Sequence, residues 1–183
     1  AGKQCQIQMW NRDPHEDLFL GSKTSCCTAL DRTNGGAMAT YLLNKSYNVV
    51  ELYDSNGEVV GMSRVFMANV DGKPTLIMDN IELNHEFTKN MQDSELRNIR
   101  DNFFKYMNLY AEKITGQKNT RVLFYAYDIH VPKDDLKRTS ETVDFIGPIH
   151  RNDVYINAAS CSWENPTKLK SIGNLSWLEV PRL

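Results

Sequence analysis

A run of acid and amide side chains follows an apolar stretch in the middle of the chain: Asp79, Asn80, Ile81 and Glu82. If the run is a strand, alternation places Asn80 and Glu82 on one face and Asp79 with Ile81 on the other. A carboxylate beside a substrate cleft could take the proton of an attacking amine, directly or through water. Glu82 is the first candidate for this role and Asp79 the second, with Asn80 beside them. The alternative interpretation is a strand end with ordinary solvated charges.

The adjacent pair Cys26 and Cys27 is a candidate for nucleophilic catalysis. A catalytic thiol needs a lowered pKa, supplied by a base or by a helix N-terminus. The sequence offers four histidines as bases: His15, His85, His130 and His150. The alternative is a buried cysteine that packs as a small apolar residue. Adjacent cysteines lack the C-x₂₋₄-C spacing of zinc ligands, so no metal site is predicted.

Two further motifs could contact ligands or partners. Asn34-Gly35-Gly36 could cradle a phosphate at the start of a short helix, or could form only a turn and a cap. Near the C-terminus, Trp163 and Trp177 flank two lysines; the segment could dock a partner or a nucleotide ring, or could cover the core as a flap. Three tyrosines on expected strands could protonate a leaving thiolate or simply belong to the core: Tyr125, Tyr127 and Tyr155.

Composition limits the classes of protein to consider. The chain has 183 residues, 41% of them hydrophobic and 24% charged, which is typical of one compact domain. The 21 Lys and Arg against 23 Asp and Glu give a net charge of −2, so no basic field favours nucleic acid or an anionic membrane. The chain has neither a bilayer-spanning apolar run nor an apolar signal core at its start. We expect a soluble protein with reduced thiols in the cytoplasm of the producing cell or of a host. Because the sequence begins without Met, it could be excised from a longer protein.

Hydrophobic periodicity predicts the elements that would position these residues. Alternation over 4–10 predicts an edge strand, the polar stretches 11–17 and 21–27 are expected to be loops, and a short helix is expected near 38–44. Apolar runs over 49–53, 58–68 and 75–83, separated by turn sequences, predict an antiparallel meander. A helix over 94–115 has apolar residues three and four apart and Gly116 as its stop. Further strands are expected over 121–127, 153–158 and 175–180. We predict a mixed, mostly antiparallel α/β sheet with the long helix on one face and the short helix on the other.

This order of elements, over about residues 4–160, resembles the core of the GCN5-related N-acetyltransferase (GNAT) fold. In that family a glycine-rich turn before the long helix holds the pyrophosphate of acyl-CoA at the helix N-terminus. The corresponding segment here, residues 84–94, contains no glycine and carries Glu86 and Asp93. The resemblance therefore implies an atypical pyrophosphate loop, with cofactor contacts expected from Leu83, Asn84 and Ser94.

A second, local resemblance is carried by residues 21–29, Gly35-Gly36 and residues 76–82. These look like uncharacterised bacterial acetyltransferase-like domains that have a Cys-Cys pair and an Asp-Asn-Ile-Glu strand. Together the resemblances imply acyl transfer from acetyl-CoA or another acyl-CoA to an amine on a small molecule or a protein. Two alternatives stay open: a non-catalytic binding or targeting module that has lost CoA binding, and a hydrolase that uses Cys26 or Cys27.

Overall fold

The structure is a computed structural model of the chain, and it describes residues 5–26, 28–32, 37–43, 47–125, 131–139, 142–145, 168–170 and 177–183. Several sequence predictions lie outside these residues and stay predictions. They concern the strand over 153–158 and the following residues: Cys27, Asn34, Gly35, Gly36, Tyr127, His130, His150, Tyr155 and Trp163.

The elements follow the hydrophobic pattern closely in the middle of the chain. The strands are β1 (Gln6–Met9), β2 (Tyr47–Tyr53), β3 (Val59–Val70), β4 (Lys73–Leu83), β5 (Arg121–Phe124), β6 (Arg138–Thr139), β7 (Thr142–Phe145), β8 (Lys168–Lys170) and β9 (Trp177–Glu179). The helices are α1 (Pro14–Asp17), α2 (Leu20–Lys23), α3 (Ala37–Leu43), α4 (His85–Thr88) and α5 (Asp93–Thr115).

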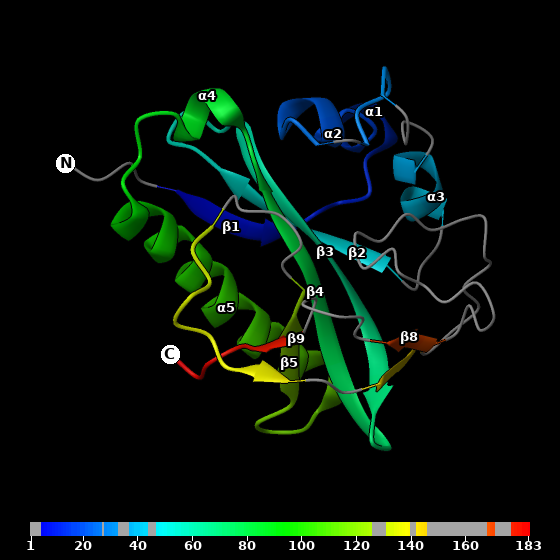
Figure 1. The fold of residues 1–183 in the computed structure, drawn as a ribbon. Helices are drawn as coiled ribbons and strands as arrows, with labels where there is room; N and C mark the ends of the chain where they lie inside the picture. The colour runs from blue at the N-terminus through cyan, green and yellow to red at the C-terminus, as the bar shows by residue number, and fades with distance from the viewer. Residues whose placement is uncertain are drawn as a thin grey trace.

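The strands form one mixed sheet in the order β1-β2-β3-β4-β5-β9-β6, with β7 beside β3 and β8 beside β7 (Figure 1). The predicted meander β2–β3–β4 is confirmed. Its two turns contain Gly57 and Gly72 at φ 79° and 74°, where side chains are strained. β5 runs parallel to β4, and the other recorded pairings are antiparallel. The predicted fold class, a mixed and mostly antiparallel α/β sheet, is therefore confirmed.

The long helix α5 covers one face of this sheet (Figure 1). Its buried face includes Phe103, Phe104 and Met107, which pack with apolar residues of β2, β3, β4 and β5 in one cluster. The helix ends at Gly116, whose φ of 67° is the left-handed conformation of a helix C-cap. In the described part of the chain, no helix is long and apolar enough to cross a bilayer.

The short helices α1, α2 and α3 lie over the opposite face, above a second cluster that contains Trp10, Met38 and Trp177 (Figure 1). The prediction of loops over 11–17 and 21–27 is wrong, because each stretch contains one turn of helix. Asp13 caps α1 by accepting a hydrogen bond from the backbone nitrogen of His15 at 2.8 Å. A single turn is too short to show helical periodicity in a sequence.

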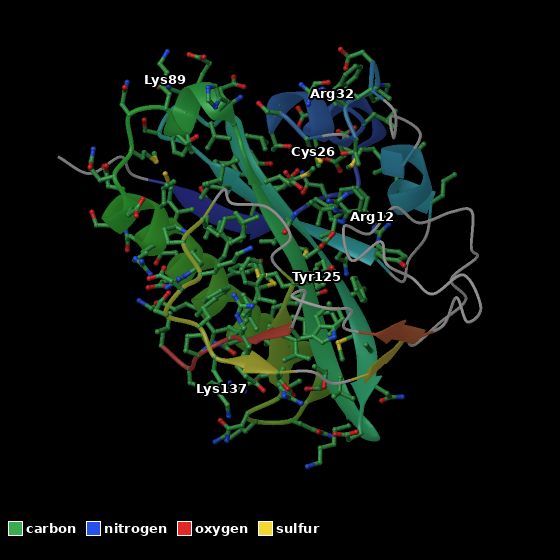
Figure 2. The ribbon with its side chains drawn as sticks, viewed as in Figure 1. Arg12, Cys26, Arg32, Lys89, Tyr125 and Lys137 are labelled. Atoms are coloured by element: carbon green, nitrogen blue, oxygen red, sulfur yellow. The ribbon has the colours of Figure 1, made fainter. Side chains whose placement is uncertain are left out.

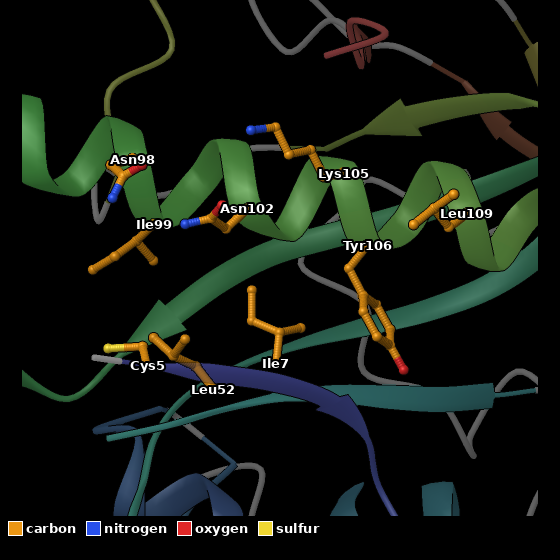
Figure 3. Close-up of a pocket in the computed structure, with 9 residues that line it drawn as sticks. All are labelled: Cys5, Ile7, Leu52, Asn98, Ile99, Asn102, Lys105, Tyr106 and Leu109. Atoms are coloured by element: carbon orange, nitrogen blue, oxygen red, sulfur yellow. The ribbon is translucent and has the colours of Figure 1, made fainter. Parts of the chain in front are cut away.

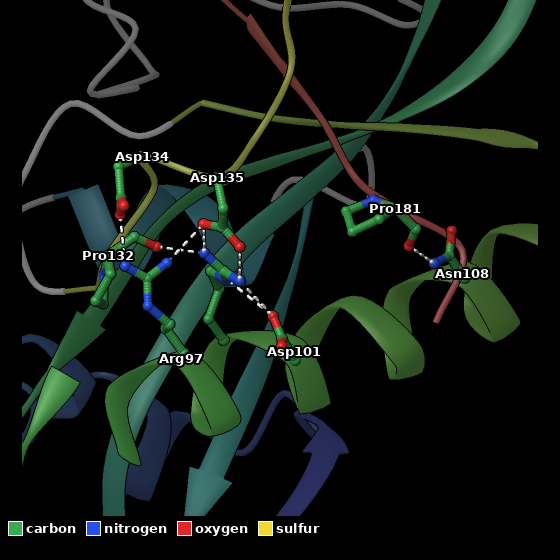
Figure 4. Close-up of polar contacts among 8 residues, drawn as sticks. Arg97, Asp101, Asn108, Pro132, Asp134, Asp135 and Pro181 are labelled. Atoms are coloured by element: carbon green, nitrogen blue, oxygen red, sulfur yellow. Dashed lines mark hydrogen bonds and ion pairs between the residues drawn. The ribbon is translucent and has the colours of Figure 1, made fainter. Parts of the chain in front are cut away.

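An ion-pair network fixes the segment 131–137 against α5 (Figure 4). The guanidinium of Arg100 is buried and donates to both carboxylate oxygens of Asp135, at 2.6 and 2.9 Å, and to the carbonyl oxygen of Pro132 at 2.6 Å. Arg97 pairs with Asp134 and Asp135 on the exposed side. Hydrogen bonding from Arg100 lowers the pKa of Asp135 to about 2.

We expect Asp135→Asn to lower the free energy of unfolding by about 1 kcal/mol, since Arg100 loses an ionised partner that solvent already screens in part. The matched change Asp134→Asn, in an exposed pair, is expected to leave it nearly unchanged. Urea unfolding of the two variants at neutral pH checks this. Equal losses from both would contradict the role given to Arg100.

Candidate active site

A β-bulge shapes the polar end of β4. Ser63 of β3 pairs with Ile81 and Val65 pairs with Met78, so Asp79 and Asn80 both lie opposite Arg64. The hydroxyl of Ser63 donates to the carbonyl oxygen of Asp79 at 2.7 Å, which stabilises the bulge from the side.

The bulge changes which side chains of β4 share a face. Asp79 and Glu82 both contact Arg64, whereas Ile81 packs in the cluster under α5. The prediction that Asp79 shares a face with Ile81 is therefore wrong. The extra residue of the bulge shifts the alternation by one position, and its presence depends on the pairing with β3 rather than on the sequence of β4 alone.

The result is a buried cluster of one cation and two anions. The Nε atom of Arg64 lies 3.4 Å from Asp79 Oδ2, and one of its terminal nitrogens lies 3.6 Å from Glu82 Oε1. The three side chains are 3%, 1% and 6% exposed. Buried charges are costly unless they are paired, so removing one member takes away part of the compensation of the other two. Both carboxylates could be selected from the sequence, but Arg64, which lies on another strand, could not.

The segment after α2 carries Cys26 (Figure 2), whose thiol lies near enough to Arg64 and Glu82 to be influenced by their charges. The side-chain amide of Asn84 donates to the carbonyl oxygen of Lys23 at 2.6 Å, which joins the end of β4 to the end of α2. An added Cβ at Gly21 would lie 2.4 Å from the backbone nitrogen of Ala29. Only glycine therefore permits α2 to pack this closely against the backbone of residues 28–29.

Cys26 is placed by the structure near Arg64 and Glu82, but in surroundings that oppose nucleophilic catalysis. Burial raises the pKa of its thiol to about 11, although the Arg64 charge acts in the opposite direction. The hydroxyl of Thr28 donates to its sulfur at 3.3 Å. The two described histidines, His15 and His85, have exposed side chains. These surroundings favour the interpretation of Cys26 as a packing residue over a cysteine-dependent hydrolase.

We expect Cys26 to react with iodoacetamide far more slowly than Cys5 in the native protein, because the thiol is buried and almost fully protonated at neutral pH. Peptide mass spectrometry after timed labelling, before and after unfolding, measures both rates. Faster labelling at Cys26 than at Cys5 would restore the hydrolase interpretation.

Sequence reasoning missed a second pair of carboxylates on this face. Glu51 of β2 is 1% exposed and Asp17 of α1 is 4% exposed. Glu51 accepts a hydrogen bond from the hydroxyl of Tyr53 at 2.7 Å. Burial, opposed in part by that hydrogen bond, raises the pKa of Glu51 to about 7, and burial also raises the pKa of Asp17. The signal in the sequence is an acid at an inward position of an apolar strand, between Val49 and Tyr53.

The raised pKa of Glu51 makes stability depend on pH. The folded state holds the Glu51 proton up to about pH 7 and the unfolded state releases it near pH 4.5, so stability falls as pH rises through this interval. We expect Glu51→Gln to reduce the loss of unfolding free energy between pH 5 and pH 8 by about 2 kcal/mol. The exposed neighbour Glu16→Gln is the control. Urea unfolding over this pH range checks the prediction, which parallel profiles for wild type and Glu51→Gln would contradict.

The residues expected to contact the cofactor are placed in different surroundings. The side chain of Leu83 is buried in the cluster under α5. Asn84 caps α4 by accepting from the backbone nitrogen of Phe87 at 3.1 Å. Ser94 is exposed in the first turn of α5. That helix begins with a capping box in which the Glu95 carboxylate accepts from the backbone nitrogen of Gln92 at 2.9 Å.

The aromatic residues near the C-terminus belong to the core where the structure describes them. Trp177 is 1% exposed, and its ring centre lies 5.0 Å from that of Tyr125, which is also buried. The indole of Trp177 is therefore not available to dock a partner or a nucleotide ring, which is one of the roles that the sequence suggested for this segment. The residue instead covers the core at β9, as the alternative interpretation of this segment predicts.

A groove of about 390 Å³ lies between β1 and α5, on the face of the sheet away from Arg64 (Figure 3). Asn98, Asn102 and Lys105 of α5 line one side, and Ile7 of β1 lines the other. The hydroxyl of Tyr106, also in the lining, accepts from the backbone nitrogen of Met9 at 3.0 Å. This groove is separate from the buried charge cluster.

No protein-family model and no curated protein sequence matches the chain. Among solved structures, it is similar to a ribosomal-protein-alanine N-acetyltransferase from Brucella melitensis biovar Abortus 2308, with a TM-score of 0.48, 18% identity, and coverage of 71% of this chain and 84% of that one. A possible acetyltransferase from Clostridium difficile 630 has a TM-score of 0.45 and 15% identity, with 72% and 82% covered. The GNAT family N-acetyltransferase YhbS from Escherichia coli, solved in complex with CoA, has a TM-score of 0.42 and 11% identity, with 68% and 62% covered.

Proposed function

We propose that the protein is a cytoplasmic N-acyltransferase, which transfers an acyl group from an acyl-CoA to an amine on a small molecule or a protein. The observation that carries the proposal is the position of Glu82. Its carboxylate is buried beside a β-bulge and held by Arg64, at the end of β4 where the described pairing with β5 has stopped.

The end of the pairing between β4 and β5 supports placing the acyl group beside the bulge of β4. The two parallel strands pair from Thr75 to Met78 on β4, and the backbone nitrogen of Tyr125 still donates to the carbonyl oxygen of Met78 at 2.8 Å. Beyond that point β4 continues to Leu83 with β3 as its partner. Peptide groups at a bulge depart from the regular ladder, and in such a place they can orient the carbonyl of a thioester.

The charged residues have distinct roles in this proposal. Glu82 would accept the proton that the amine loses as its nitrogen bonds to the acyl carbon, while the carbon–sulfur bond of the thioester breaks and CoA leaves as the thiolate. Arg64 is a positioning residue that holds the Glu82 carboxylate, and Asp79 balances the same guanidinium from the bulge. Asn80 completes the polar end of the strand as a candidate for contact with the acceptor.

The described residues fit the thioester part of an acyl-CoA better than its diphosphate part. When bound, the cofactor supplies an acyl group activated as a thioester, and the bulge of β4 suits that group. The segment before α5 suits a diphosphate less well, because Glu95 already caps the helix and the first turn carries Asp93. We propose that the backbone of Leu83 and the hydroxyl of Ser94 contact the cofactor, without a glycine-rich loop. The backbone of Asn84 suits this role less well, because its nitrogen donates to the carbonyl oxygen of Val60 at 2.8 Å and its carbonyl oxygen accepts from the backbone nitrogen of Thr88 at 3.2 Å.

The same capped helix start favours a second candidate, a binding module on this fold that takes no CoA. The two candidates differ in turnover. We expect purified protein with acetyl-CoA and a mixed panel of amines to release CoA thiol, measured with a disulfide dye, and to form acylated amine, detected by mass spectrometry. Absence of both products with every amine would favour the binding module.

A further inference from the structure

The groove between the edge strand β1 and the long helix α5, here called the β1–α5 groove, lies apart from the proposed active site (Figure 3). Its volume of about 390 Å³ is in the range of sites that bind small molecules. Its apolar lining includes Ile7 of β1, Leu52 of β2 and Ile99 of α5. Leu52 and Ile99 are buried members of the core, so this part of the lining is held in place by packing. The groove can therefore shelter an apolar chain.

The backbone of β1 adds a hydrogen-bond donor to this lining. Hydrogen bonds between antiparallel strands alternate along each strand, and the nitrogen of Trp10 donates toward β2, to the carbonyl oxygen of Val49 at 2.9 Å. The nitrogen of Met9 points away from β2 and donates to the hydroxyl of Tyr106 on α5 at 3.0 Å. Ile7 precedes Met9 by two residues, so its N–H points to the same side, toward the groove. Among the strands that the structure describes, only β2 pairs with β1, so no ladder acceptor reaches this N–H.

The groove has a positive charge at its edge and no acid in its lining. Lys105 is exposed, and Figure 3 shows its side chain extended at the outer edge of the groove. The acids one turn before it and two turns after it are engaged elsewhere: Asp101 pairs with Arg100 and Glu112 pairs with Arg182, each at 2.7 Å. Within the described part of the chain, Lys105 itself has no ion pair. Its flexible stem lets the ammonium reach a negative charge at the mouth of the groove.

Two amide side chains stand beside this cation. Asn98 and Asn102 line the groove from α5, and both are exposed. Asn102 and Lys105 are three residues apart on the helix, so their side chains are neighbours. Neither amide has a hydrogen-bond partner among the described residues. Donors from both sides of the groove can therefore meet one anionic group.

We propose that the β1–α5 groove binds a medium-chain fatty acid as its carboxylate. The carboxylate accepts from Asn102, Lys105 and the N–H of Ile7, and the alkyl chain lies over Leu52 and Ile99. An amine of the same length would bring a second positive charge to Lys105, and an uncharged chain would leave the donors without a charged acceptor. The site is independent of acyl transfer at Glu82.

The test is calorimetry on the full chain without any acyl donor, with sodium decanoate and decylamine as probes below their micelle concentrations. We expect decanoate to bind about five- to tenfold more tightly, since an exposed ion pair favours it and repulsion disfavours the amine. Each methylene added from hexanoate to decanoate should raise the affinity by about two- to fourfold. Lys105→Gln is expected to remove most of the preference for decanoate, and Lys113→Gln, at an exposed position of α5 outside the groove, to keep it. Equal binding of the two probes to wild type, or an unchanged preference in Lys105→Gln, would overturn the inference.

Backbone amide chemical shifts locate the decanoate site. We expect the largest changes at Ile7 and over residues 98–109. Asn102→Trp, which fills the groove from an exposed position, should abolish these changes and leave the free energy of unfolding nearly unchanged. Changes confined to residues 79–83 would place decanoate at the proposed acyl site and would overturn the inference.

Light scattering tests whether a second copy of the chain covers the groove instead. We expect wild type to have the same mass with and without decanoate as Asn102→Trp. A wild-type dimer that Asn102→Trp dissociates would assign the groove to a second copy and overturn the inference. Decanoate binding in the groove without any CoA binding would leave the inference standing and remove the proposed function.

Discussion

Replacing Arg64 with methionine is expected to lower the free energy of unfolding by about 3–5 kcal/mol, because two buried carboxylates then lose their shared cation. Asp79 and Glu82 are almost fully buried, so water does not take over the role of the guanidinium. Methionine has a similar length and no charge, so the change tests charge rather than packing. Guanidinium chloride unfolding with linear extrapolation gives the difference.

Two controls keep this result specific to the charge cluster. Arg97→Met, at a more exposed ion pair of α5, is expected to have little effect. Adding Asp79→Leu and Glu82→Met to Arg64→Met is expected to recover much of the lost stability, because an apolar cluster has no unpaired charge. A loss below about 1 kcal/mol for Arg64→Met would show that the carboxylates are compensated by other groups.

Glu82→Gln is expected to lower kcat/KM for acyl transfer by about 10²–10⁴-fold, the usual contribution of a general base. Glutamine keeps the size of the side chain but cannot accept the proton of the amine. We expect the loss to appear in kcat, with the affinity for CoA unchanged, and the remaining rate to rise with pH as more of the amine is deprotonated in solution. Steady-state kinetics of CoA thiol release over a pH range measures all three.

Glu86→Gln is the matched control for this variant. Glu86 is a nearby acid on α4, and its side chain is exposed and paired with Lys89. Full activity of Glu82→Gln would remove Glu82 from the mechanism. Asp79→Asn, with the same assay, would then test the second candidate on the bulge.

The elements that could be predicted are those whose pattern is local. The apolar spacing in α5 and the glycine turns of the meander are set by neighbouring residues, so these parts agree with the structure. The helical turns of α1 and α2 were missed because one turn shows no periodicity. The bulge at Asp79 was missed because it depends on which residue of β3 lies opposite.

In the candidate site, too, the features set by residue type could be predicted and those set by strand pairing could not. Residue type alone could select Glu82, Asp79 and Cys26, since acids and thiols within an apolar stretch are candidates for catalysis. Arg64 and Glu51 could not be joined to them, because contacts across strands follow from register and not from position in the chain. The burial that raises the pKa of Cys26 is likewise a property of the packed state.

The most direct test of an acyl-CoA-dependent transferase is a titration of the purified protein with CoA and acetyl-CoA, followed by calorimetry and by backbone amide chemical shifts. We expect micromolar binding, with the largest shifts in residues 79–94, around the bulge of β4 and the start of α5. Absence of binding at millimolar CoA would contradict the proposed function, and would leave a binding module on this fold.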